Sequence, residues 1–241
     1  MHLLAIETSS PVLSVAVQKS GGRVSEKHLE GFSQHAENLL PLLDRALKSA
    51  QLDLQYIQAF LIGRGPGSFT GLRVGFATLK ALQSVTPRPC FGALSLDMIA
   101  ENIPAEGAKS LAVCMDARRD KLYTRFYQSS RGFWVPQGAA MVLDAAEWLR
   151  AVPKEALVTG DALERYQDLL KKAENLKAVQ RAAAEASWPR ASSLIRMFAR
   201  QNFKAGADTT VRRMDKPRDL IPYYLRLSEA EERRREHAPA C

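Results

Sequence analysis

Hydrophobic and polar positions along the chain follow two different periods, which predicts an alternation of strands and helices. Residues 12–19 alternate strictly, with Leu13, Val15 and Val17 on one side of a predicted strand. Residues 33–50 instead carry apolar side chains at three- and four-residue spacing, which predicts an amphipathic helix. Ser33 is expected to cap this helix, and Pro41 is expected to kink or restart it.

The remaining elements are predicted in the same way. Strands are expected over residues 3–7, 12–19, 24–29, 59–62, near Phe91, 110–115, 122–127, 156–159 and 176–180, and helices over residues 33–50, 70–85, 95–102, 144–149, 161–172, 192–201 and from Ser228. Such an alternation is typical of an α/β protein. The stretch 103–107 contains Pro and Gly and is expected to be a linker. It would divide the chain into an N-terminal lobe of residues 1–103 and a C-terminal lobe of residues 104–241.

A glycine-rich turn joins an apolar strand to a helix. Residues 63–75 read GRGPGSFTGLRVG, with glycines on both sides of a proline. Such a turn can bind an anion with its backbone amides, or it can let another backbone segment come close, and the sequence leaves both roles open. Thr70 is expected to cap the helix that follows, in which Gly71 and Gly75 lie on one face and favour close packing.

Neither common phosphate-binding motif fits this turn. A Walker A loop ends in Gly-Lys followed by Ser or Thr, whereas residues 70–72 are Thr-Gly-Leu. The dinucleotide motif G-x-G-x-x-G is nearly met from Gly65, but its last position is Thr70 and the turn lies far from the first strand. A dinucleotide-binding role is therefore disfavoured.

The composition is that of a globular chain with a basic surface. The 241 residues are 46% hydrophobic and carry a formal net charge of +8 at pH 7, which favours an acidic partner such as RNA. The three cysteines show no C-x-x-C spacing, so neither a disulfide framework nor a zinc site is indicated, and a reducing cytoplasm is expected. Neither a basic n-region nor an apolar run of about 20 residues is found, so we expect neither export nor a membrane location.

Five motifs along the chain resemble, in order, those of the bacterial TsaB (YeaZ) family. They are IETS at residues 6–9, SQHAENLLP at 33–41, GPGSFTGLR at 65–73, MDARR at 115–119 and YLR at 224–226. The resemblance implies the two-lobed ASKHA (actin/sugar-kinase/Hsp70-like) α/β fold, with a mixed sheet and helices in each lobe. It also implies a non-catalytic subunit in the formation of threonylcarbamoyladenosine at position 37 of tRNAs. In this family the protein pairs with its catalytic paralogue TsaD, and the ATPase TsaE joins them.

The number and spacing of the histidines favour a non-catalytic role. In the family that the chain resembles, the catalytic paralogue holds a metal with an H-x-x-x-H pair after the last strand of the first lobe. Residues 93–100, at the corresponding place in this chain, contain no histidine. The four histidines, His2, His28, His35 and His237, are not spaced three or four residues apart. We therefore expect no catalytic residue and no metal site of that type, although carboxylates alone could bind Mg²⁺. No cofactor is expected to be required, while ATP, ADP or Mg²⁺ at an interface of the complex stays open.

Weak nucleotide contacts are expected at two turns. The resemblance puts one of them, Glu7-Thr8-Ser9, on the hairpin where ASKHA enzymes hold phosphate and metal, with Glu in place of the usual Asp. The other, Gly160-Asp161, resembles the second phosphate segment faintly. The plain alternatives are an ordinary hairpin turn and a helix cap.

The basic tail is a candidate contact for tRNA phosphates. The residues expected to make this contact are Arg212, Arg213, Lys216, Arg218 and the arginines at 233–235. The alternative is a solvated tail. No signature of an RNA-binding module is found, so we expect weak electrostatic help within the complex.

Two helices carry the expected partner surface. The resemblance implies that their outward sides pack against the equivalent helices of TsaD in a four-helix interface, and that two copies could form a homodimer when the partner is missing. The residues expected at this interface are His35, Leu39, Leu43, Leu47, Gly71, Leu72, Gly75, Phe76 and Leu79. The alternative is that both apolar stripes cover the chain's own sheet.

Three classes of function therefore compete. A non-catalytic scaffold of the tRNA-modifying complex is favoured by the ordered motifs and the missing histidine pair. An ASKHA-fold nucleotide hydrolase or kinase is the second. A peptidase is the third, but neither a metal pair nor a nucleophile triad is recognisable.

Overall fold

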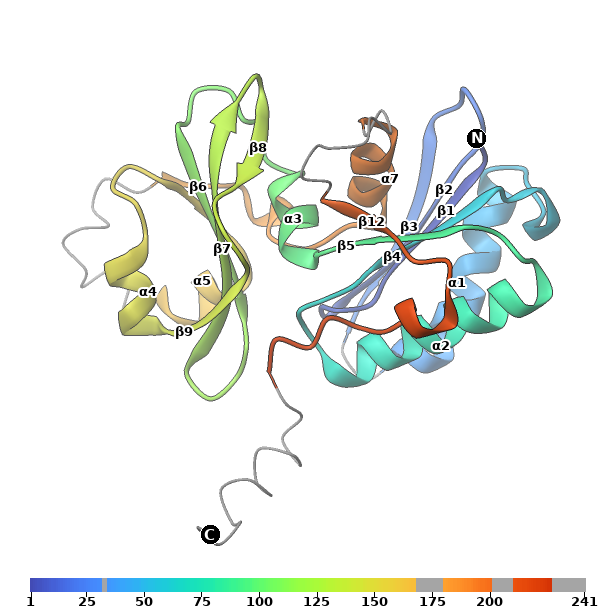
Figure 1. Cartoon of the computed structure of the whole chain (residues 1–241), viewed down its shortest axis with the longest axis horizontal. Coiled ribbons are helices and arrows are strands. Elements are labelled where there is room, and N and C mark those ends of the chain that lie inside the picture. The colour runs from blue at the N-terminus through green and yellow to red at the C-terminus, as the bar shows by residue number, and fades with distance from the viewer. Residues whose placement is uncertain (32–33, 168–179, 201–209, 227–241) are drawn as a thin grey trace, which may run out of the picture.

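The computed structural model describes residues 1–31, 34–167, 180–200 and 210–226 of the chain. These residues form two lobes, each built on a mixed sheet with helices (Figure 1). The expected α/β, two-lobed fold is confirmed. Within the described residues, none of the helices has the length and apolar character needed to cross a membrane.

The first lobe is built on a six-stranded sheet of order β12-β5-β4-β1-β2-β3. Its strands are β1 (Leu3–Glu7), β2 (Val12–Gln18), β3 (Val24–Glu30), β4 (Ala59–Gly63), β5 (Cys90–Ala93) and β12 (Val211–Arg213). Strands β1, β4 and β5 are parallel to one another, whereas β2, β3 and β12 pair antiparallel with their neighbours. The sheet therefore combines a hairpin meander with parallel crossovers.

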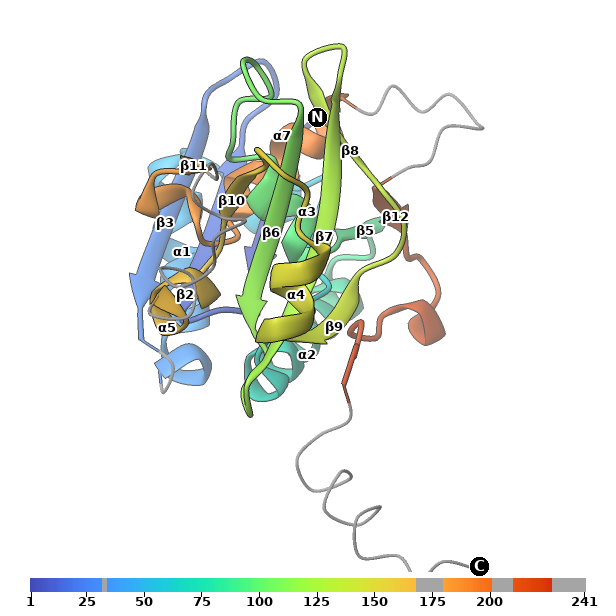
Figure 2. The same ribbon diagram turned by 90° about the vertical axis from the view of Figure 1, so that its left-hand side faces the viewer.

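Helices cover both faces of this sheet. Helices α1 (His35–Ser49) and α2 (Phe69–Val85) lie on one face, and α7 (Ala191–Arg200) lies on the other (Figures 1 and 2). The predicted alternation in β2 is confirmed, because Leu13, Val15 and Val17 belong to the α1–α2 core while Ala16 packs on the α7 side. Each buried Leu or Val side chain contributes about 1.5–3 kcal/mol to this packing.

The ends of α1 and α2 differ from the expected ones. Ser33 lies outside the described residues, and α1 runs unbroken through Pro41. A proline inside a helix costs about 3 kcal/mol, and the buried apolar face of α1 offsets that cost. Ser68, not Thr70, caps α2, because its Oγ accepts a 3.2 Å hydrogen bond from the N–H of Gly71.

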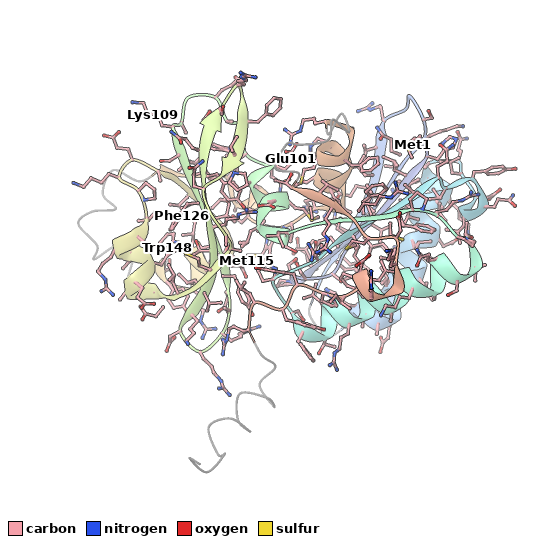
Figure 3. The ribbon with its side chains drawn as sticks, viewed as in Figure 1. Met1, Glu101, Lys109, Met115, Phe126 and Trp148 are labelled. Carbon is pink, nitrogen blue, oxygen red and sulfur yellow. The ribbon has the colours of Figure 1, made fainter. Side chains whose placement is uncertain are left out.

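The second lobe is built on a sheet of order β11-β10-β6-β7-β8, with β9 also paired to β7. Its elements are β6 (Ser110–Asp116), β7 (Lys121–Ser130), β8 (Phe133–Pro136), β9 (Met141–Asp144), α4 (Ala145–Ala151), β10 (Leu157–Thr159), α5 (Ala162–Arg165) and β11 (Gln180–Arg181). Figure 3 shows Phe126 and Trp148 on the α4 side of this sheet and Met115 on the side facing the first lobe. The sequence patterns missed β8 and β9. Residues 168–172 of the expected helix 161–172, residues 176–179 of the expected strand 176–180, and the charged helix expected from Ser228 lie outside the described residues.

Helix α3 (Ser95–Ala100) is shared by the two lobes. Its Met98 packs into the α7 side of the first lobe, whereas Leu96 and Ile99 pack against β6 and β7 of the second. The chain then returns, because α7 and β12 follow the second sheet in sequence but belong to the first lobe. The expected C-terminal lobe of residues 104–241 is corrected accordingly: only β6–β11 with α4 and α5 form the second lobe.

A segment after β12 connects the lobes a third time, and we name residues 220–226 the strap. The N–H of Tyr223 donates a 2.7 Å hydrogen bond to the carbonyl of Arg64, and the ring of Tyr224 lies 4.9 Å from that of Phe69. At the other end, the guanidinium of Arg226 donates to backbone carbonyls of the β6–β7 turn. The 3-10 helices η2 (Leu54–Tyr56), η4 (Ala184–Ala186) and η5 (Pro217–Asp219) complete the described structure.

Candidate functional site

The glycine loop (residues 63–75) packs against the turn between β1 and β2 (residues 7–10, the hairpin turn). The N–H of Ser68 donates a 2.7 Å hydrogen bond to the carbonyl of Ser9. A Cβ at Gly67 would lie 2.2 Å from the same carbonyl oxygen, and one at Gly71 would lie 2.1 Å from the carbonyl oxygen of Thr8. Side chains at these two positions would overlap backbone atoms, so the loop serves as a close-packing surface for the hairpin turn.

The carboxyl group of Glu7 is enclosed within this contact. Its Oε1 accepts a 2.5 Å hydrogen bond from the N–H of Ser9, and its Oε2 accepts one of 3.3 Å from the hydroxyl of Ser95. Glu7 is fully buried, and a Cβ at Gly63 would lie 1.6 Å from Oε2. Burial raises the pKa of the Glu7 carboxyl above its usual value, although the hydrogen bonds oppose this shift.

The first turn expected to contact nucleotide is therefore closed by the chain itself. Glu7 and Thr8 have no exposed surface, and Ser9 is 2% exposed. The backbone amide of Ser9 is already bonded to Glu7, and its hydroxyl donates to Ser95 Oγ at 2.8 Å. These contacts give Glu7, Thr8 and Ser9 a structural role, while contact with a nucleotide at this turn remains a prediction.

His35 belongs to the same structure rather than to a partner surface. The side chain is 5% exposed, and its Nε2 lies 2.9 Å from the carbonyl oxygen of Ser10. The imidazole thus ties the first turn of α1 to the hairpin turn. No signal in the sequence distinguished this buried contact from an interface histidine.

The other residues expected at the partner interface are also buried within the chain. Leu39, Leu43, Leu47, Phe76 and Leu79 belong to the core between the sheet and α1–α2, Leu72 is fully buried, and Gly71 and Gly75 face Thr8. The plain alternative, in which both stripes cover the chain's own sheet, is correct for these side chains. The outward positions are different residues: Leu40 is 60% exposed on α1, and Arg73, Ala77 and Ala81 are exposed on α2.

The turn Gly160-Asp161 closes against the end of β6 in the second lobe. Gly160 has φ +121°, and a Cβ there would lie 1.8 Å from the carbonyl oxygen of Cys114. Asp161 Oδ1 accepts a 3.1 Å hydrogen bond from the N–H of Asp116, whose own carboxylate lies 3.2 Å from the guanidinium of Arg165. Burial raises the pKa of Asp161 to about 7, and the nearby Asp116 charge adds to the shift. These contacts give Gly160 and Asp161 a structural role, while nucleotide contact remains a prediction.

The expected RNA-contact residues lie at and beyond the edge strand β12. Arg212 lies 3.9 Å from Asp219, Arg213 pairs with Asp215, and Lys216 and Arg218 are exposed. A three-residue edge strand was too short to recognise in a run of basic residues. The arginines at 233–235 lie outside the described residues. Contact with RNA remains a prediction.

The described residues contain no group of three or more His, Cys, Asp or Glu side chains placed to hold a metal ion. Cys90 and Cys114 are buried thiols, and burial raises the pKa of Cys90 to about 12. The side chains around the hairpin turn are held by hydrogen bonds and by packing.

Comparisons with known proteins agree on one family. The family model described as TsaD, tRNA N6-adenosine threonylcarbamoyltransferase, matches residues 31–232. The chain is 27% identical to TsaB, a tRNA threonylcarbamoyladenosine biosynthesis protein of Bacillus subtilis, with 96% of each chain covered. It is 29% identical to TsaB of Escherichia coli, with 70% of this chain and 75% of that protein covered. A solved structure of YeaZ from Pseudomonas aeruginosa is 26% identical, with a TM-score of 0.73 over 93% of this chain and 99% of that chain.

Proposed function

Because the chain belongs to the TsaB (YeaZ) family, within the TsaD threonylcarbamoyltransferase family, we propose that it is the non-catalytic scaffold subunit of the complex that forms threonylcarbamoyladenosine in tRNA. The chain takes part in the biosynthesis of this modified nucleoside. As a scaffold it would pair with the catalytic paralogue TsaD, help to recruit the ATPase TsaE and meet tRNA through the complex. Two buried thiols suit a reducing cytoplasm.

The contact between the hairpin turn and the glycine loop carries this proposal. Glu7 is the acidic residue of the first hairpin, and its carboxyl group is sequestered by Ser9, Ser95 and the backbone at Gly63. A buried carboxyl group with its hydrogen bonds satisfied inside the chain supports a structural role rather than a role with substrate.

The outward faces of α1 and α2 supply a surface for the paralogue. Leu40 and Pro41 are exposed on α1, and Ala77 and Ala81 are exposed on α2, so the face combines an apolar side chain with small ones. Small side chains allow the backbones of facing helices to approach closely, and ridges-into-grooves packing of two such pairs makes a four-helix interface. The same face on a second copy would allow a homodimer when TsaD is absent.

Surface variants test this assignment. Leu40→Asp and Ala77→Arg place charges on the outward face without touching the core, so both variants should fold with the stability of the wild type and fail to co-purify with TsaD. Val135→Asp is the matched control, because Val135 is 41% exposed on β8 of the second lobe. Undiminished co-purification of TsaD with folded Leu40→Asp and Ala77→Arg variants would contradict the assigned surface.

The alternative of a nucleotide hydrolase or kinase makes a different prediction. Such an enzyme would turn over ATP as the purified chain, and Glu7→Ala would abolish the turnover because Glu7 is the acidic group of the first hairpin. The scaffold proposal predicts that turnover, if present, is unrelated to the buried Glu7 carboxyl group.

A further inference from the structure

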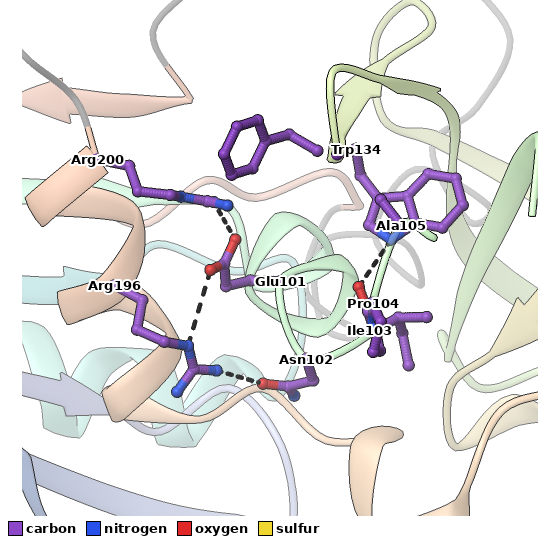
Figure 4. Close-up of a pocket in the computed structure, with 10 residues that line it drawn as sticks. Glu101, Asn102, Ile103, Pro104, Ala105, Trp134, Arg196 and Arg200 are labelled. Carbon is purple, nitrogen blue, oxygen red and sulfur yellow. Dashed lines mark hydrogen bonds and ion pairs between the residues drawn. The ribbon is translucent and has the colours of Figure 1, made fainter. Parts of the chain in front are cut away.

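A cavity of about 350 Å³ lies between the end of α3, the helix α7 and the start of β8 (Figure 4). It is separate from the hairpin turn and from the outward faces of α1 and α2. Its chemistry-bearing residues are Glu101, Asn102, Arg196, Arg200, Phe133 and Trp134. The volume falls in the range of small-molecule sites.

The cavity has an excess of positive charge. Arg200 forms an ion pair with Glu101, and the Nε of Arg196 lies 3.7 Å from the same carboxylate. The Glu101 side chain is 10% exposed, whereas those of Arg196 and Arg200 are 47% and 41% exposed. Each guanidinium has five N–H donors, so one carboxylate cannot satisfy both groups. The exposed guanidinium edges are therefore suited to a further anion.

Joining α3 to α7 does not require both arginines, because Asn102 already makes that connection. The Asn102 side-chain amide donates to the carbonyls of Trp188 at 2.8 Å and Ala186 at 3.3 Å. Its Oδ1 accepts from the hydroxyl of Ser193 on α7. Arg196 takes part in this connection, because its Nη2 donates to Asn102 Oδ1 at 3.2 Å and to Ser193 Oγ at 2.9 Å, whereas Arg200 lies outside it and pairs with Glu101. Both guanidinium groups nevertheless remain about half exposed.

An aromatic ring lies beside the cations. The guanidinium carbon of Arg200 is 4.6 Å from the centre of the Phe133 ring, which is 49% exposed. Arg131 and Gly132 both have positive φ, +52° and +79°, so β7 and β8 are joined by a tight two-residue hairpin turn. This turn fixes the position of Phe133, the first residue of β8. The Trp134 indole is held by a 2.9 Å hydrogen bond from its Nε1 to the carbonyl of Ile103.

We infer that this cavity binds a nucleotide, with its phosphate on Arg196 and Arg200 and its base against the ring of Phe133. Cations paired with an exposed aromatic ring are the elements from which proteins build sites for single-stranded nucleic acid. An acidic peptide would use the cations but not the ring. The inference rests on the proposed function in one respect: a tRNA strand would supply the nucleotide within the complex, whereas a free nucleotide shares the same chemistry.

Binding of a ten-nucleotide, fluorescein-labelled single-stranded RNA to the purified full-length chain tests the site by fluorescence anisotropy. Arg196→Gln, Arg200→Gln and Phe133→Leu should each weaken binding by about fivefold to tenfold, and the arginine variants should reduce the salt slope by about 1. Arg150→Gln and Tyr56→Leu are matched controls, because both side chains are exposed far from the cavity, and they should bind as the wild type. The double variant Glu101→Gln with Arg200→Gln keeps the test valid if Arg200→Gln alone unfolds, because the nearly buried Glu101 carboxylate is then not left without Arg200.

Competition with unlabelled ligands separates the possible sources. Displacement by adenosine monophosphate indicates that a free nucleotide suffices, and displacement by RNA alone indicates a site for a strand; both support the inference. Equal displacement by inorganic phosphate or by an acidic peptide, or unchanged affinity in all three cavity variants, overturns it. Because the assay contains only this chain, its failure is distinguishable from failure of the scaffold proposal, which is tested with the complex.

Discussion

The backbone N–H of Ser68 is bonded to the carbonyl of Ser9 at 2.7 Å, so the glycine loop and the hairpin turn touch backbone to backbone. Contact at this distance leaves no room for side chains at the facing positions. It also explains why a helix as long as α2 tolerates two glycines in its first two turns, although each costs about 1 kcal/mol relative to Ala. The cost is offset by close packing of Gly71 and Gly75 on Thr8.

The glycine contacts predict an order of destabilisation. Gly71→Ala sets a Cβ 2.1 Å from the backbone oxygen of Thr8, which cannot move without shifting the hairpin turn. Gly75→Ala sets one 2.4 Å from the Thr8 side-chain Oγ1, which Thr8→Ala removes. We expect each glycine variant to lower the free energy of unfolding by about 1–3 kcal/mol, with Gly71→Ala the more severe. Urea denaturation gives these values.

A second substitution sharpens this prediction. Thr8→Ala should restore part of the stability lost in Gly75→Ala, but none of that lost in Gly71→Ala, because only the first clash involves the Thr8 side chain. Ala77→Ser, on the exposed face of α2, should change stability by less than about 0.5 kcal/mol. Equal rescue of both glycine variants would show that the backbone contact does not limit the packing.

The raised pKa of Asp161 predicts a pH dependence of stability. The usual Asp pKa is 3.8 and the folded value is about 7, so the folded protein binds the extra proton between these values. Its contribution to stability is present below pH 3.8 and is lost as pH rises toward 7. Asp161→Asn keeps an acceptor for the Asp116 N–H and removes the titration. Its stability relative to wild type should therefore rise with pH by at most about 1.4 kcal/mol per unit, then level off.

Chemical denaturation at pH 4, 5.5, 7 and 8.5 measures this difference. Asp120→Asn is the control, because Asp120 is an exposed residue of the β6–β7 turn. A stability difference between Asp161→Asn and wild type that stays constant across this range would contradict a carboxyl group titrating near neutral pH.

The strap predicts that Arg226 protects the β6–β7 turn. Its guanidinium donates to the carbonyls of Ala117 and Arg118, and hydrogen bonds from a charged donor contribute about 1.5–3 kcal/mol. In Arg226→Gln, trypsin cleavage after Arg118 or Arg119 should be faster by about tenfold, because the turn opens more often. Mass spectrometry of the fragments measures the rate. Arg45→Gln on α1 should leave it unchanged, and an equal rate in Arg226→Gln would show that the strap does not hold the turn.

Most of the fold could be predicted from local patterns. The alternation in β2 and the three-four spacing in α1 identify both elements, because large apolar side chains follow the strand period on one side of β2 and the helix period on one face of α1. Pro41 misled the prediction, since tertiary packing of α1 outweighs its local cost. The return of β12 to β5 could not be predicted, because three residues carry no period and the pairing partner lies far away in the sequence.

The site was only partly predictable, for a related reason. The spacing of Gly71 and Gly75 predicted that another segment packs closely against this face of the helix. It could not identify that segment as Thr8 of the same chain. Periodicity likewise identified the apolar stripe of α1. It could not distinguish the leucines that are buried in the core from Leu40, which is exposed. The cavity at Glu101 and Arg200 joins residues from three distant segments, and no motif marks it.

The central claim is that this chain serves the modification by supporting its catalytic paralogue. The most direct measurement combines the purified chain with TsaD, TsaE, threonylcarbamoyl-adenylate and unmodified tRNA, omits each component in turn, and quantifies threonylcarbamoyladenosine after tRNA digestion. We predict strong product formation with all components, little without this chain, and none from this chain alone. Product from this chain alone, or undiminished product in its absence, would contradict the claim.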